Sequence, residues 1–150
     1  LLPIRLLMAY EFGSAGLRKF NASDTWWGDV PGWFENSLQN FPFPISLFSP
    51  SFNWFMVTWI EILGGIALAL GLFTRFWAFS LIIVTWVAIL GVHWPDSYSS
   101  LAELWKGYAV SDNGFGNYRI PLLFLVMLLP LLFHGAGKLS IDHLLARRLK

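Results

Sequence analysis

Residues 53–93 read NWFMVTWIEILGGIALALGLFTRFWAFSLIIVTWVAILGVH, and this stretch decides the fold. Glu61 and Arg75 are its only acidic or basic residues apart from the final histidine. A helix needs about 20 mostly apolar residues to cross a hydrocarbon layer roughly 30 Å thick. Because Arg75 and the threonine before it interrupt the apolar run, the stretch predicts two membrane-spanning helices, 53–73 and 76–93, joined by a tight turn.

Two weaker apolar segments lie on either side of this pair. The first, 1–20, carries Arg5 and Glu11, and the second, 120–134, contains Pro130, which is expected to kink a helix there. Membrane helices tolerate such interruptions where neighbouring helices satisfy the freed backbone groups. The sequence therefore predicts an all-α fold, a four-transmembrane-helix bundle that forms one domain over the whole chain.

The composition agrees with a membrane protein. Of the 150 residues, 56% are hydrophobic and 13% are charged, about half the charged fraction of a typical soluble domain, and mean hydropathy is +0.57. Nine Trp and fourteen Phe suit a lipid interface. The net charge of +1 gives no broad electrostatic field that would attract a nucleic acid. The apolar composition predicts a lipid bilayer as the partner. The chain has no cysteine, which excludes thiol chemistry, Cys-ligated metals and disulfides.

The basic residues indicate the orientation. Loops 21–52 and 94–119 would share one side of the membrane, and the 74–75 turn and the C-terminal tail the other. The turn and tail hold five Lys/Arg and the opposite side four, so the positive-inside rule favours an inner-membrane protein with both termini in the cytoplasm. The five are Arg75, Lys138, Arg147, Arg148 and Lys150, and the four are Arg18, Lys19, Lys106 and Arg119.

Capping signals predict further helix starts. Ser49 followed by Pro50 is typical of an N-cap and first turn, here for the second span. Ser100 and Glu103 have capping-box spacing, which predicts a short interfacial helix over about 101–108 in the second outer loop. The aromatic first outer loop should also lie on the membrane surface.

Ionisable residues within the spans are the candidate site. A charge in a bilayer costs roughly 2.5–3.5 kcal/mol on insertion scales and usually has a partner. Counting 1.5 Å per residue from the outer ends of their helices places Glu11 about 13 Å deep and Glu61 about 10 Å deep. Both carboxylates should thus face one outer pocket, near basic or titratable side chains at the same side. The candidate ligand-binding residues are Glu11, Glu61, His93, Arg119, Lys19 and Arg18.

Two interpretations of this cluster stay open. It binds a polar-headed molecule or a proton-coupled redox ligand such as a quinone, or its charges pair with one another and hold the bundle together. On the cytoplasmic side, Arg75, Lys138 and Asp142 are predicted to form structural ion pairs. No metal site is predicted, because the three histidines lack ligand spacing and His93 lies opposite the other two.

Several motifs, taken in order, resemble the DoxX family of small four-helix membrane proteins. They are R-x-x-x-x-x-E-F and G-L-R-K-F in the first segment, W-x-E-I-x-G-G-x-x-L-x-L-G-L-x-T-R from Trp59, and G-A-G-K-L-S-I-D from Gly135. Glu61, Gly65, Gly71, Arg75, Gly135, Gly137 and Asp142 are the positions that match. The segments H-W-P, S-L-A-E-L-W-x-G-Y and S-D-x-G-F-G-N-Y are similar to the HvfX-type branch, whose members accompany copper-binding ribosomal peptides.

The resemblance implies an accessory membrane subunit of a redox or copper-peptide maturation assembly. With no cysteine in the chain, any redox role requires a bound cofactor, for which a quinone is the candidate. The resemblance leaves open whether the chain is an enzyme. The alternatives are a non-catalytic anchor or assembly factor and, less favoured for four spans without an inverted repeat, a transporter of small molecules.

Overall fold

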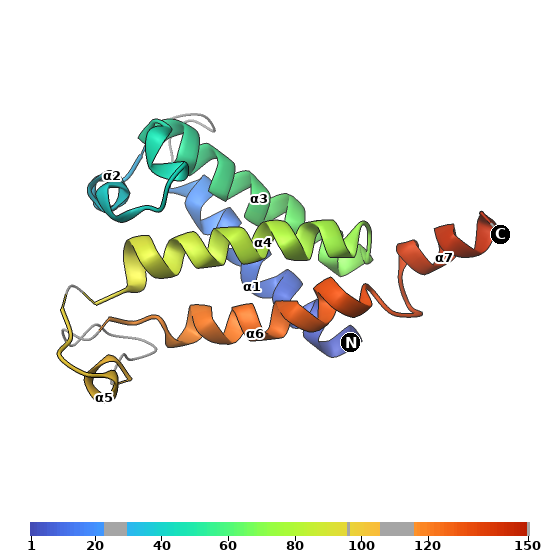
Figure 1. Cartoon of the computed structure of the whole chain (residues 1–150). Helices are drawn as coiled ribbons and strands as arrows, with labels where there is room; N and C mark the ends of the chain where they lie inside the picture. The colour runs from blue at the N-terminus through green and yellow to red at the C-terminus, as the bar shows by residue number, and fades with distance from the viewer. Residues whose placement is uncertain (23–29, 96, 106–115, 150) are drawn as a thin grey trace.

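Four long helices lying side by side form the body of the protein (Figure 1). A computed structural model describes residues 1–22, 30–95, 97–105 and 116–149, and within these ranges the chain is helical with connecting turns and has no strand. The long helices are α1 (Leu2–Asn21), α3 (Pro50–Leu70), α4 (Thr74–Ala88), which continues as the π-helical turn η3 (Ile89–His93), and α6 (Arg119–His134). The all-α prediction is confirmed.

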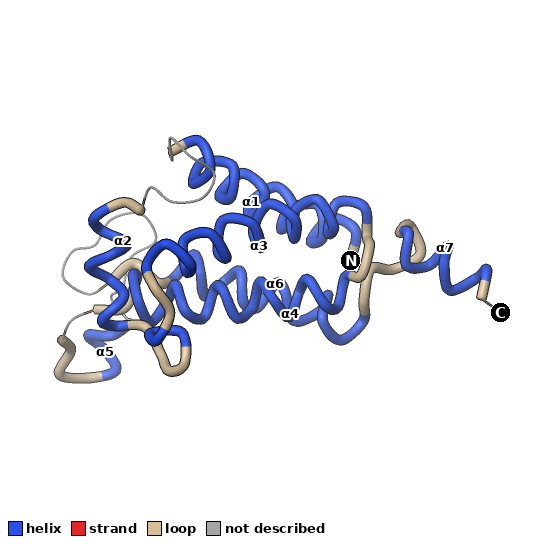
Figure 2. Tube along the Cα trace, turned by 90° about the horizontal axis from the view of Figure 1, so that it is seen from above, coloured by secondary structure: helices blue, strands red, loops and turns tan. Residues whose placement is uncertain are grey.

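The bundle has two unlike ends. Short helices gather at one, which we name the loop end: α2 (Gly32–Ser37), η1 (Leu38–Asn40), η2 (Ile45–Leu47) and α5 (Leu101–Leu104). The other, the terminal end, holds the start of α1, the α3–α4 turn and α7 (Ile141–Arg148), which projects away from the bundle in both views (Figures 1 and 2).

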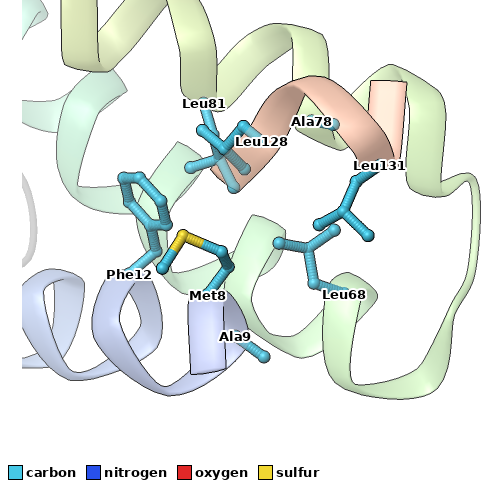
Figure 3. Packing of buried hydrophobic residues seen from close by; sticks show 8 residues of the cluster. All are labelled: Met8, Ala9, Phe12, Leu68, Ala78, Leu81, Leu128 and Leu131. Carbon is cyan, nitrogen blue, oxygen red and sulfur yellow. The ribbon is translucent and has the colours of Figure 1, made fainter. Parts of the chain in front are cut away.

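Apolar side chains from all four long helices form the core (Figure 3). Its buried members come from all four of these helices: Met8, Ala9, Phe12, Leu68, Ala78, Leu81, Leu128 and Leu131. The closest packing joins α1 to α3 and α4 to α6. Each antiparallel pair buries one apolar stripe, so the opposite stripe of each helix faces outward.

Local sequence sets the bounds of α3. The Ser49 hydroxyl accepts a hydrogen bond from the Phe52 N–H at 3.3 Å, and Pro50 occupies the first turn, as the capping signal predicted. At the other end Gly71 adopts the left-handed conformation at φ 67°, and the Leu72 N–H bonds to the Ala67 carbonyl, which closes the helix. The helix therefore runs three residues ahead of the predicted 53–73 at both ends.

Two of the described helices are long and apolar enough to cross a membrane, Pro50–Leu70 and Thr74–His93. The third apolar helix, α6, has 16 residues, and α1 has the length but carries four charged side chains. Of the predicted helix 101–108, residues 101–104 are helical as α5, and 106–108 lie outside the described residues. Two lysines of the charge count, Lys106 and Lys150, also lie outside them. The Ser100 hydroxyl accepts from the Glu103 N–H at 3.3 Å, as the capping box predicts.

Candidate functional site

A mostly apolar cavity of about 440 Å³ opens at the loop end of the bundle. All four long helices and the segment 30–48 line it, so the site exists only in the assembled bundle. Four of the six predicted ligand-binding residues contribute to its wall: Glu11, Lys19, Glu61 and His93. A large apolar surface with a few polar groups is the usual composition of a small-molecule site.

The polar centre of the cavity is an ion pair between α1 and α3. Lys19 Nζ donates to Glu61 Oε2 at 2.7 Å. The Glu61 residue is 6% exposed, so its carboxylate is nearly removed from solvent while the ammonium group is partly open. A buried charge of this kind is tolerated because its partner is close.

A glycine on α1 makes room for this pair. A Cβ placed on Gly16 would lie 2.8 Å from the backbone nitrogen of Ile62 and 3.0 Å from Glu61 Cβ. Such distances are shorter than van der Waals contact allows, so only glycine lets α1 approach α3 this closely. The same contact sets the register: Glu61 lies level with Gly16.

That register separates the two carboxylates in depth more than the sequence predicted, where Glu11 was placed about 13 Å and Glu61 about 10 Å deep. Glu11 lies five residues from Gly16 along α1, about 7.5 Å at 1.5 Å per residue, toward the terminal end. Both carboxylates still line the same cavity, one above the other.

His93 closes the wall at the end of η3. Its Nδ1 lies 2.7 Å from Asn117 Oδ1, and its carbonyl accepts the Asn117 N–H at 3.0 Å. Because the Asn117 oxygen is an acceptor, the neutral imidazole that fits this contact carries its proton on Nδ1 and its lone pair on Nε2. The imidazole is thus held in one orientation, with an acceptor nitrogen for a ligand hydroxyl.

The remaining two candidates lie outside the cavity wall. Arg18 is exposed on α1. The Arg119 guanidinium donates to the Trp105 carbonyl and lies over the Trp105 ring, with 5.5 Å from Cζ to the ring centroid. Arg119 therefore ties α6 to α5 at the loop end rather than facing Glu61.

The sequence did not predict the aromatic roof of the cavity, the cluster of Phe34, Phe41 and Trp54. Phe34 lies edge-on to Trp54 and to Phe41, with ring centroids 4.9 and 5.6 Å apart. A Cβ on Gly91 would lie 2.2 Å from the Phe41 ring, so that glycine in η3 admits the ring. The buried Asn53 amide donates to the Ile45 carbonyl at 3.2 Å and holds the loop in place. The aromatic density of residues 26–43 was the available signal.

At the terminal end, Asp142 bonds to the backbone instead of forming the ion pairs predicted with Arg75 and Lys138. The Asp142 carboxylate accepts from the backbone N–H groups of Phe73 and Thr74 at 2.7 and 2.9 Å. Asp142 thus caps the start of α4, although it lies almost 70 residues later in the chain. Within the described residues, no ion pair joins Asp142 to Arg75 or Lys138.

Arg5 reaches the same end. Its Nη1 and Nη2 donate to the Ala136 and Leu139 carbonyls at 2.8 and 2.7 Å, and the residue is 3% exposed. A Cβ on Gly71 would lie 2.5 Å from Arg5 Nη1 and from Ser140 Cβ. The G-A-G-K-L-S-I-D segment is therefore fastened to α1 and to the α3–α4 turn.

Comparison with known proteins gave two matches. A sequence profile of the DoxX family matches residues 1–94, which span α1 to η3 and hold the cavity residues Glu11, Lys19, Glu61 and His93. A protein of Haemophilus influenzae described as uncharacterized is 37% identical over 147 residues, which make up 98% of this chain and 83% of that protein. No solved structure matches the chain. Among the described residues, no group of three His, Asp or Glu side chains is placed to hold a metal ion.

Proposed function

Because this chain belongs to the DoxX family of membrane proteins, we propose that it is a four-span accessory subunit of a redox or copper-peptide maturation assembly and binds a quinone-like molecule at the loop end. The observation that carries this proposal is one cavity that combines an apolar, aromatic wall with a buried Glu61–Lys19 pair and an oriented His93. A quinone needs both: apolar surface for its ring and tail, and polar groups for its oxygens.

The exposed surface supports four spans. Each long helix presents large apolar side chains outward, a pattern that is costly in water and favourable in lipid. Examples are Leu6 and Tyr10 of α1, Ile66 of α3, Phe79 of α4 and Val126 of α6, all 47–71% exposed. Two of the four charged side chains of α1 have partners within the bundle: Arg5 bonds to two carbonyls and Lys19 to Glu61. With the loop end outside, both termini of the proposed inner-membrane protein lie in the cytoplasm.

The cavity contacts suggest how a quinone head would bind. The ammonium group of Lys19 is the hydrogen-bond donor to one carbonyl oxygen, and Nε2 of His93 accepts from a hydroxyl in the reduced form. Glu61, shielded from solvent, is the proton-accepting group nearest the donor. Because the chain carries no thiol, the electrons for a bound quinone must come from a partner. A subunit with these groups can hold the quinone near that partner.

A non-catalytic anchor is the second candidate, and one observation favours it. The Lys19–Glu61 pair lies beside the tight contact of α1 with α3 at Gly16, so it also joins two helices. Glu61→Gln separates the candidates. The binding proposal expects weaker quinone binding by a protein that still migrates as folded on a native gel. The anchor candidate expects no quinone binding in either form, and disassembly if the pair holds the helices.

A photoreactive quinone analogue provides the direct test. The purified protein in detergent is labelled, digested and mapped, and the label is expected on residues that line the cavity. Ala88→Phe fills part of that cavity and should reduce labelling at least tenfold, about 1.4 kcal/mol of binding free energy.

Ala69→Phe is the matched control, because Ala69 is exposed on α3 and does not line the cavity. It should leave labelling unchanged. Labelling that maps to the outward faces of the helices, or that Ala88→Phe leaves intact, would reject the site.

A further inference from the structure

We propose that the terminal end of the bundle holds a second site, which binds the phosphate of an anionic phospholipid headgroup. A pocket of about 650 Å³ lies there between the start of α4 and the segment that follows α6. Nothing in the loop-end site uses it, and its wall includes Arg75 and Lys138, which the loop-end cavity lacks. The lipid assignment rests on the proposed membrane-spanning bundle.

Two basic side chains, Arg75 and Lys138, line the pocket. Arg75 comes from the first turn of α4, and Lys138 comes from the segment between α6 and α7. His134 and His143 add two titratable donors. Within the described residues, no hydrogen bond or ion pair engages the side chains of Arg75, His134 or Lys138. These side chains are therefore available to an anion.

The one acidic side chain of the pocket, Asp142, is already engaged by the backbone. The Asp142 carboxylate accepts two backbone N–H groups at the positive end of the α4 dipole. An arriving phosphate therefore meets the unengaged charges of Arg75 and Lys138. A guanidinium binds two phosphate oxygens at once, and an ammonium adds a point charge.

The backbone places these cations. Gly135 and Gly137 have φ angles of 77° and 79°, which a side chain would strain, and they turn the chain so that Lys138 faces α4. A Cβ on Gly135 would lie 3.5 Å from Arg75 Nε, so the arginine lies directly over that turn.

The neighbouring surface indicates a lipid rather than a free phosphate. Phe76 lines the pocket and is 61% exposed, and Phe79, one turn further along α4 on the same face, is 54% exposed. An acyl chain can follow these rings into the bilayer while its phosphate stays at the cations. Basic pockets at the cytoplasmic ends of membrane helices suit such headgroups.

Native mass spectrometry of the detergent-purified protein tests this inference. Phosphatidylglycerol is titrated against phosphatidylcholine with the same acyl chains, and one phosphatidylglycerol is expected to remain bound where phosphatidylcholine does not. Arg75→Gln with Lys138→Gln should weaken that binding at least tenfold. The matched control is Arg147→Gln with Arg148→Gln, which removes the same charge from exposed positions of α7 outside the pocket and should have no effect.

Three results would overturn the site: equal binding of both lipids, equal weakening by both double variants, or full displacement of the lipid by millimolar inorganic phosphate. Lys138→Glu, a single change at an exposed side chain, should also abolish binding if the double variant does not fold. Quinone labelling at the loop end is measured on the same variants. Loss of lipid with labelling intact separates this inference from the proposed function.

Discussion

At the scale of single residues, the loop-end cavity is organised by one buried charge and the cation that neutralises it. Glu61 is level with Gly16, at a tight contact between α1 and α3, and Lys19 lies one helical turn nearer the opening. Removing a charge from water costs several kcal/mol unless a partner compensates it. The pair is therefore both a polar centre for a ligand and a constraint on helix packing, and substitutions of its two members should differ in effect.

Lys19→Met should destabilise the protein by roughly 3 kcal/mol, because the carboxylate of Glu61 is then buried without its partner. Glu61→Gln should cost about 1 kcal/mol, since the amide oxygen still accepts from the ammonium group. Denaturant unfolding in detergent micelles measures both. Arg18→Met is the control: this neighbouring cation is exposed, so its loss should cost less than about 1 kcal/mol. Equal losses for Lys19→Met and Arg18→Met would contradict a specific pair.

At the scale of helices, glycines determine how α1 meets α3. A Cβ on Gly65 would lie 2.7 Å from Gly13 Cα and 2.9 Å from the Ala9 carbonyl oxygen. A Cβ on Gly13 would lie 3.9 Å from Gly65 Cα, an ordinary contact. The two glycines face each other, yet only one of them is indispensable.

Gly65→Ala should therefore force the helices apart and destabilise the bundle by about 1–3 kcal/mol, the usual cost of overpacking. Gly13→Ala, the same chemical change across the same contact, should be tolerated. Thermal unfolding of both variants in one detergent tests the asymmetry. If Gly13→Ala were as harmful as Gly65→Ala, the described register between α1 and α3 would be wrong.

The long helices were predictable because each is a long apolar run between polar segments. Helix α7 was not, because its eight residues read as a polar tail although Ser140 caps it by accepting from the His143 N–H at 3.2 Å. For the site, the approach of Glu61 to Lys19 needed the register that Gly16 sets. The roof over the cavity needed the fold of residues 30–48, in which Phe41 packs on Gly91. Contacts between segments that are far apart in the chain produce no periodic pattern of residues, so the sequence alone did not predict them.

Asp142 connects the C-terminal segment to the start of α4, and Asp142→Ala should expose that start. Loss of the two accepted N–H groups should cost about 1–3 kcal/mol, because charged acceptors make the stronger hydrogen bonds. Hydrogen exchange should accelerate at the amides of Phe73 and Thr74. Asp142→Asn retains one acceptor oxygen and should give an intermediate rate. Unchanged exchange at both amides would show that the carboxylate does not cap the helix.

At the scale of the whole molecule, the two ends have different chemistry. The loop end carries the aromatic roof and the apolar cavity, and the terminal end carries the basic pocket and both chain termini. Between them, each long helix shows an apolar outer face. A bilayer that surrounds this middle layer leaves the two sites in different compartments, so a ligand of one end cannot reach the other without crossing the membrane.

Single-cysteine labelling tests that arrangement cleanly, because the natural chain has no cysteine. Gln39→Cys at the loop end should react with a membrane-impermeant maleimide in intact cells. Arg147→Cys on α7 should react only after the membrane is opened, since five basic residues favour the cytoplasm for that end. Leu123→Cys, on the exposed face of α6, should resist the reagent in both conditions because lipid covers it. Labelling of Gln39→Cys and Arg147→Cys from the same side would rule out four spans, because three of those spans, α3, α4 and α6, lie between the two positions and an odd number of crossings places them on opposite faces of the membrane.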